Sequence, residues 1–136
     1  MIPPMIATTA ISHVMSPCPF VIDLDEPLSS AHALMRQHGI RHLPVAQHGN
    51  LVGLISAGDL HLFETLDDVE PDEISVKEAM TPDPYCVAPN APLRDVVRAM
   101  ADHKYGCALV TQGAEIVGIF TTVDALRALA DILSQG

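Results

Sequence analysis

The chain has 136 residues, 49% of them hydrophobic, and a formal net charge of −10 at pH 7. This composition is typical of a folded globular chain, and it contains no apolar run of about 18 residues that would span a membrane. Nucleic acids and anionic membrane surfaces attract basic proteins, so the excess of acid argues against both partners.

The first half predicts the element order strand, helix, strand, strand, helix. An apolar stretch at 20–22 indicates a short strand, and Asp25-Glu26-Pro27 opens a helix with apolar residues at spacings of three and four. Gly39 is well placed to end that helix. Strands at 42–46 and 51–55 follow around a turn, and the last helix begins at Ser56, a good N-cap residue.

The second half repeats this order 65 residues later. Shifting the chain by 65 positions aligns 12 identical residues over the 45 positions from 15 to 59, without a gap. Chance would give roughly three for such a composition. Six acidic residues and no basic one lie between Glu64 and Glu73, which is typical of a solvated linker. We therefore expect a first repeat at 8–63, an acidic linker at 64–74 and a second repeat at 75–134.

Each half opens on Met, Ser or Thr, and Pro, and later carries Gly, two apolar residues, Ser or Thr, two variable residues and Asp. These motifs lie at 15–17 and 80–82, and at 53–59 and 118–124. Together with Arg41-His42-Leu43-Pro44-Val45, they resemble tandem CBS domains, a pair called a Bateman module, over about residues 10–131. The resemblance implies a stand-alone pair without an effector domain. The fold class we expect is α+β, with two β-α-β-β-α repeats packed sheet to sheet in pseudo-twofold symmetry.

The second motif has a physical logic of its own. A strand ends just before Ser56 or Thr121, where a hydroxyl and free backbone N–H groups at a helix start suit a phosphate. One turn later, Asp59 or Asp124 offers a carboxylate that can accept hydrogen bonds from ribose hydroxyls. A simple helix cap uses the same residue types, so that alternative stays open.

The resemblance implies that adenosine ligands lie in two clefts, each lined by both repeats. Carried over by position, cleft one consists of Phe20, Ile40, Arg41, His42, Thr121 and Asp124. Cleft two consists of Tyr85, Tyr105, Gly106, Ser56 and Asp59. The permanent charge of Arg41 favours cleft one for a phosphorylated ligand. In cleft two, the two tyrosines are expected to sandwich a base.

The remaining candidate side chains indicate neither a catalytic site nor a metal site. Neither Ser56 nor Thr121 has a base supplied by a motif, so we expect no catalytic residue and no enzyme. The histidines between 32 and 48 share no regular helical face, and the three cysteines form no Cys-x-x-Cys pair, so we expect no metal site. Cysteines in this pattern favour a reducing, cytoplasmic location.

Two functions follow as hypotheses. The first is a regulatory sensor that binds an adenosine compound, with AMP, ADP or ATP preferred and NAD or S-adenosylmethionine possible, and that signals occupancy to a protein target. The resemblance also implies a homodimer formed through the apolar helix faces. The second is a ligand-independent scaffold for protein–protein interaction.

Overall fold

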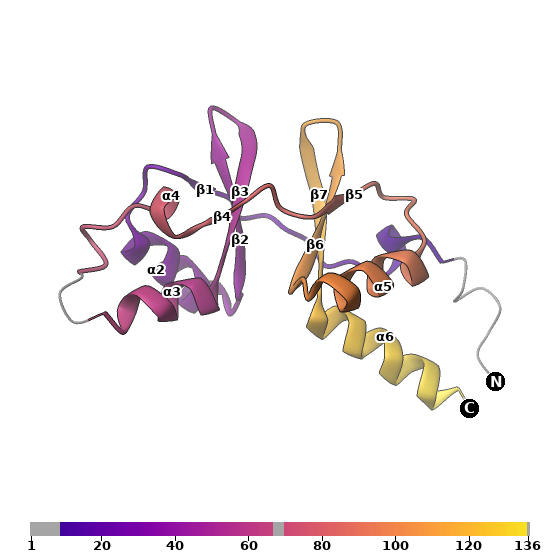
Figure 1. Ribbon diagram of the computed structural model, residues 1–136. Coiled ribbons are helices and arrows are strands. Elements are labelled where there is room, and N and C mark those ends of the chain that lie inside the picture. Colours follow the sequence, from indigo (N-terminus) through magenta and orange to yellow (C-terminus); the bar gives the residue numbers. More distant parts are fainter. Residues whose placement is uncertain (1–8, 67–69, 136) are drawn as a thin grey trace. The chain divides into compact units, whose positions relative to one another are not determined.

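The computed structural model describes residues 9–66 and 70–135 (Figure 1). The chain forms two compact units. The first-repeat unit is Phe20–Pro84, and the second-repeat unit joins the segment up to Pro19 with the chain from Tyr85 onward. No helix within 9–66 and 70–135 is long and apolar enough to cross a membrane.

The first-repeat unit has one four-stranded sheet in the order β1-β2-β3-β4. Strand β1 runs parallel to β2, whereas β3 pairs antiparallel with both β2 and β4. The elements in chain order are β1 (Ile22–Asp23), α2 (Leu28–His38), β2 (His42–Gln47), β3 (Asn50–Ser56), α3 (Ala57–Glu64), α4 (Val76–Ala79) and β4 (Thr81–Pro82).

The second-repeat unit has a three-stranded sheet in the order β5-β6-β7. Its elements are η1 (Ile11–His13), β5 (Cys86–Val87), α5 (Leu93–His103), β6 (Cys107–Gln112), β7 (Glu115–Thr121) and α6 (Thr122–Ser134). Strand β5 is parallel to β6, and β6 is antiparallel to β7, as in the first-repeat unit. The expected α+β class and the repeated element order are therefore confirmed.

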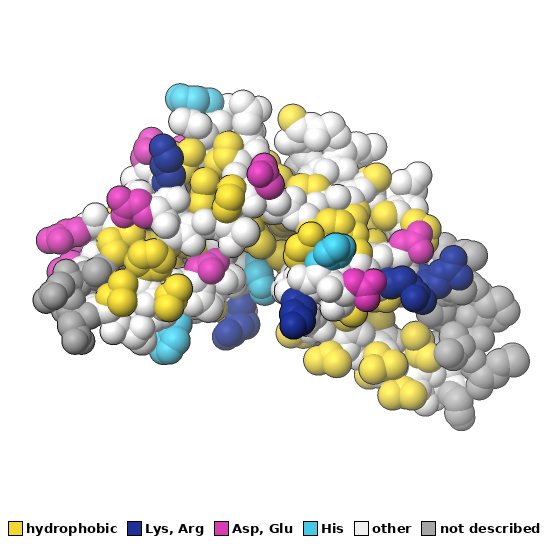
Figure 2. Space-filling model, viewed as in Figure 1, with side chains coloured by type: hydrophobic (Ala, Val, Ile, Leu, Met, Phe, Trp, Pro, Cys, Tyr) yellow, Lys and Arg dark blue, Asp and Glu magenta, His cyan; other side chains and the backbone are white. Residues whose placement is uncertain are grey.

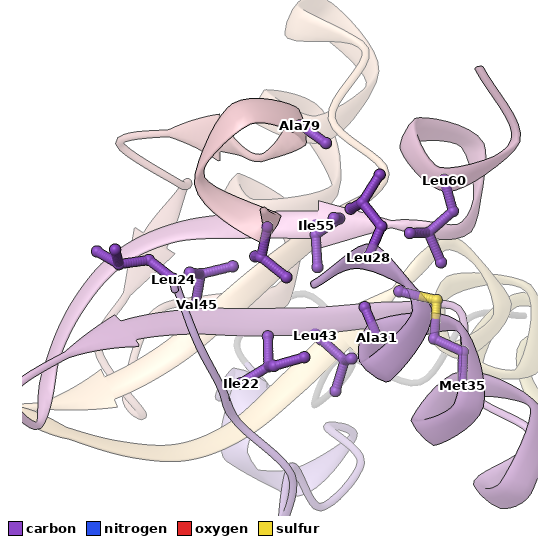
Figure 3. Packing of buried hydrophobic residues seen from close by; sticks show 11 residues of the cluster. Ile22, Leu24, Leu28, Ala31, Met35, Leu43, Val45, Ile55, Leu60 and Ala79 are labelled. Carbon is purple, nitrogen blue, oxygen red and sulfur yellow. The ribbon is translucent and has the colours of Figure 1, made fainter. Parts of the chain in front are cut away.

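Helix α2 buries the side predicted by its apolar spacing. Leu28, Ala31 and Met35 lie in the core of the first-repeat unit, next to residues from both central strands (Figure 3). The helix ends at Gly39, which has the left-handed φ of 64° that glycine adopts without strain. At the matching position in the second half, Lys104 adopts a φ of 59° and ends α5 in the same way.

The opening segment of each repeat packs on the sheet of the other repeat. Strand β4 follows the acidic stretch and opens the second repeat, yet it pairs with β3 of the first. In the same way, Ser16 pairs with Ile119 on β7. Because of this exchange, the compact units begin and end at residues different from those of the sequence repeats, whose boundaries stay a prediction.

A glycine makes room for each exchanged segment. A Cβ at Gly53 would lie 2.9 Å from the Thr81 carbonyl oxygen and would meet the Met80 side chain. A Cβ at Gly118 would lie 3.0 Å from the Ser16 carbonyl oxygen and would meet the Met15 side chain. The methionine of the opening motif and the glycine of the later motif therefore occur together because they contact each other.

We expect Gly53→Ala and Gly118→Ala each to lower the free energy of unfolding by about 1–3 kcal/mol, because the new methyl group overpacks a close backbone contact. The matched control is Gly58→Ala on α3, where a Cβ would lie 3.6 Å from Ser56 Oγ, an ordinary contact. Helix propensity predicts that this control is neutral or slightly stabilising. Urea unfolding measures all three, and equal stability of the three variants would contradict the exchange.

Candidate functional site

In the first-repeat unit, β3 passes directly into α3 through a complete capping box. Asp59 N donates to Ser56 Oγ at 3.1 Å, and Ser56 N donates to Asp59 Oδ2 at 2.9 Å. Each residue thus satisfies a backbone donor of the other. The Asp59 side chain stays partly exposed. The helix cap is therefore real, and it forms on a residue that is only partly buried.

The end of the neighbouring strand brings Arg41 and His42 to this junction. His42 is the register partner of Ser56, and Ala57 N donates to the Arg41 carbonyl oxygen at 2.8 Å. Arg41 is exposed and His42 is partly buried. The sequence prediction had divided these residues between two clefts. The structure places Arg41 and His42 together with Ser56 and Asp59 in one unit.

The electrostatics of this junction favour a neutral His42. Burial is the largest cause that lowers the pKa of His42 below 6.5, and the positive Arg41 lowers it further. Asp59 acts in the opposite direction and raises the same pKa. Near pH 7, Arg41 is therefore the permanent cation beside an imidazole that offers hydrogen bonds rather than charge.

The lowered pKa of His42 predicts a loss of stability in acid. Below pH 6.5 the unfolded imidazole binds protons before the folded one does, so the free energy of unfolding falls as the pH decreases from there. We expect His42→Asn to reduce this fall when urea unfolding is compared at pH 7.5 and pH 5.5. The control is His48→Asn, which replaces an exposed turn residue whose φ of 53° suits asparagine. An unchanged pH dependence in His42→Asn would contradict the assignment.

The aromatic site residues make different stacks in the two units. Phe20 stacks on His38 with ring centroids 3.8 Å apart, and it also packs against the core together with Ile40. In the second-repeat unit, Tyr105 stacks on Tyr85 at 5.0 Å and on His103 at 5.1 Å.

The spacing of the two tyrosines decides how they could meet a base. A base between two rings needs about 7 Å, twice the optimal carbon–carbon contact. At 5.0 Å, Tyr85 and Tyr105 leave no such space between them. The expected sandwich is therefore wrong for this arrangement.

In the second-repeat unit, β7 passes into α6 through a matching capping box. Thr121 N donates to Asp124 Oδ2 at 2.9 Å, and Asp124 N donates to Thr121 Oγ1 at 3.4 Å. Gly106 lies next to this junction, because its carbonyl oxygen accepts a hydrogen bond from Thr122 N at 3.2 Å. Thr121 and Asp124 are thus brought together with Gly106, a residue assigned to the other cleft.

Ser16 reaches the same carboxylate from a distant part of the chain. Its hydroxyl donates to Asp124 Oδ1 at 2.7 Å, and the Asp124 side chain is only 5% exposed. The sequence analysis did not single out Ser16 as a candidate site residue. The available signal was the hydroxyl residue in the middle of both opening motifs, Ser16 and Thr81.

Each predicted cleft draws residues from both units. Phe20, Ile40, Arg41 and His42 lie in the first-repeat unit, whereas Thr121 and Asp124 lie in the second-repeat unit. Tyr85, Tyr105 and Gly106 lie in the second-repeat unit, whereas Ser56 and Asp59 lie in the first-repeat unit. The sharing of clefts between repeats stays a prediction. Among the described side chains, no three of His, Cys, Asp and Glu form a group that could hold a metal ion.

Comparison with known proteins identifies one family along most of the chain. The family description CBS domain matches residues 11–63 and again residues 76–131. The inosine-5'-monophosphate dehydrogenase of Korarchaeum cryptofilum is 31% identical over 101 residues, which are 74% of this chain. They are 20% of that enzyme, so this chain spans about a fifth of its length.

Two solved structures share the fold. One is the CBS domain pair of protein MJ0100 in complex with 5'-methylthioadenosine and S-adenosyl-L-methionine, with a TM-score of 0.81 and 23% identity. The match covers 91% of this chain and 98% of that one. The other is the CBS domain of the bacterial CNNM/CorC family Mg²⁺ transporter in complex with ATP, with a TM-score of 0.79 and 21% identity. That match covers 93% of this chain and 90% of the other.

Proposed function

Because this chain belongs to the CBS domain family and carries the domain twice, we propose that it is a regulatory module that binds an adenosine-containing ligand. The observation that carries the proposal is the pair of strand-to-helix junctions, each with a hydroxyl cap and a carboxylate one turn into the helix. A carboxylate there suits ribose hydroxyls, and the helix start suits a phosphate. The ligands of the two solved structures support this, since 5'-methylthioadenosine, S-adenosyl-L-methionine and ATP all contain adenosine.

Among adenosine compounds, AMP, ADP and ATP fit the charges best. Arg41 is exposed and permanently positive, and its planar fork can bind phosphate oxygens in pairs. His42 beside it is neutral near pH 7 and adds a hydrogen bond without charge. NAD and S-adenosylmethionine are the alternative ligands. The proposal includes the two clefts predicted from the sequence, each with residues of both repeats.

We propose that ligand binding changes the conformation of this chain and that a protein target recognises the change. The chain itself catalyses no reaction in this proposal. Both capping hydroxyls already serve as helix caps. Ser56 Oγ and Thr121 Oγ1 each accept a hydrogen bond from a backbone N–H group in the first turn of the following helix. A ligand shifts the populations of two states only by its difference in affinity for them. We also propose that the protein acts in the cytoplasm, as the cysteine pattern leads us to expect. The second candidate function is a ligand-independent scaffold for protein–protein interaction.

Ligand binding is tested by thermal unfolding of nucleotide-free protein with AMP, ADP, ATP, NAD and S-adenosylmethionine, with guanosine nucleotides as controls. A ligand at a hundred times its Kd should add about 2.7 kcal/mol, which corresponds to several degrees. We expect the Asp59→Asn/Asp124→Asn double variant to lose the response. Asp95→Asn, which changes an exposed carboxylate outside both junctions, should keep it. No response to any adenosine compound would favour the scaffold.

Helix α6 supports the proposed homodimer because it is apolar on two sides. Ala125 and Ala128 pack against the core of the second-repeat unit. The α6 stripe, which we define as Val123, Leu126, Leu129 and Leu133, stays between 47% and 71% exposed. Figure 2 shows apolar side chains gathered over this helix. An uncovered stripe of this kind is a liability in a monomer, so we propose that a second copy covers it.

The α6 stripe predicts that Leu126→Asp/Leu133→Asp converts a dimer to a monomer, because four charges would be buried in the interface. Sedimentation velocity measures the change. The matched control is Leu62→Asp on α3, because Leu62 is 63% exposed and Leu126 is 64% exposed. A wild-type monomer at high concentration, or dissociation by Leu62→Asp alone, would contradict an interface on α6.

A further inference from the structure

The two candidate ribose carboxylates are not equivalent. The Asp124 carboxylate accepts three hydrogen bonds within its own unit. They come from Ser16 Oγ at 2.7 Å, Thr121 N at 2.9 Å and Thr121 Oγ1 at 3.2 Å. Arg127 Nη1 lies 3.7 Å from the same oxygen that Ser16 contacts. With both oxygens engaged and only 5% exposure, this carboxylate has little capacity left for a ribose.

The Asp59 carboxylate is less occupied. Within residues 9–66 and 70–135, the hydrogen bond it accepts is the one from Ser56 N at 2.9 Å. Thr81 occupies the position that matches Ser16, and its side chain is exposed on β4. In the described chain, Thr81 makes no hydrogen bond to Asp59. One oxygen of Asp59 therefore accepts no hydrogen bond in the described chain, whereas both oxygens of Asp124 do.

We propose that Ser16 closes the Asp124 site, so that Asp59 takes the first molecule of ligand. This inference rests on the proposed function and names the residue that sets the order of its two sites. The order differs from the sequence expectation, in which Arg41 favoured the cleft with Asp124, because the structure places Arg41 beside the junction that carries Asp59. A hydroxyl bonded to a buried carboxylate makes one of the stronger hydrogen bonds in proteins, because the acceptor is charged. A ribose hydroxyl must displace Ser16 before it reaches Asp124 Oδ1.

The backbone holds Ser16 in place for this role. Ser16 N donates to the Ile119 carbonyl oxygen at 2.8 Å, and Ile119 N donates to the Ser16 carbonyl oxygen at 2.9 Å. Met15, the residue before it, packs against Gly118. The backbone therefore holds the Ser16 hydroxyl close to Asp124. The side chain loses little conformational freedom when it forms its hydrogen bond to the carboxylate, so it competes well with a ligand. Removing the hydroxyl leaves both backbone hydrogen bonds intact.

The experiment is calorimetric titration of nucleotide-free protein with AMP and, separately, with S-adenosylmethionine. In the wild-type protein we expect one strong site that Asp59→Asn weakens at least tenfold, whereas Asp124→Asn weakens only the second, weaker site. Ser16→Ala should strengthen binding at a second site at least tenfold. That gain should disappear in Ser16→Ala/Asp124→Asn.

Two matched variants separate loss of the hydroxyl from a general disturbance of the segment. Ser16→Thr keeps a hydroxyl and should bind like the wild-type protein, as the Thr81 of the second opening motif suggests. Thr81→Ala removes the exposed hydroxyl of the other segment and should also leave binding unchanged.

The outcomes distinguish this inference from the proposed function. Binding that Asp124→Asn abolishes first, or that Ser16→Ala weakens or leaves unchanged, would overturn the role of Ser16 alone. If neither wild-type nor Ser16→Ala protein binds any adenosine compound, the proposed function is wrong, and the role of Ser16 fails with it.

Discussion

The close contact between each opening segment and a strand glycine organises both units. Gly53 on β3 and Gly118 on β7 lack the Cβ that would meet a methionine and a backbone carbonyl. Because of that space, β4 extends the first sheet and Ser16 pairs with β7. Each unit therefore contains chain from both repeats, and neither repeat completes its own structure. A single repeat would have a small core, and this exchange joins the two without a disulfide.

In the second-repeat unit, the exchanged segment meets the helix start, because Ser16 donates to Asp124 in the first turn of α6. The last residue of each long strand caps the following helix, and the carboxylate one turn later returns a hydrogen bond. The same groups that stabilise the helix start are the ones that a ribose and a phosphate would contact. Binding and capping are therefore alternative uses of one hydrogen-bonding capacity. Under the proposed function, the extra donor from Ser16 would make this competition stronger at Asp124 than at Asp59.

The two repeats have diverged around a common frame. Phe20 and His38 stack directly on each other, whereas in the second repeat Tyr105 stacks on both matching rings, Tyr85 and His103. Arg41 and a neutral His42 border one junction, while Gly106 borders the other. The duplicated fold thus presents two strand-to-helix junctions that differ in charge and in their neighbouring side chains. Under the proposed function, this difference would allow two ligands, or two affinities for one ligand, in a single chain.

The sequence alone determined the element order, the N-caps of α3 and α6 and the two copies of the fold. These features depend on apolar spacing and on hydrogen bonds between near neighbours, such as those of Ser56 with Asp59, so they can be predicted from local patterns. Only the tertiary structure decided that Ser16 bonds Asp124, 108 positions away, and that Arg41 lies beside the junction of α3. It also decided that the two tyrosines stack on each other. Contacts between distant residues depend on how strands pair and how segments pack. The spacing of residues within one segment does not predict this pairing or packing.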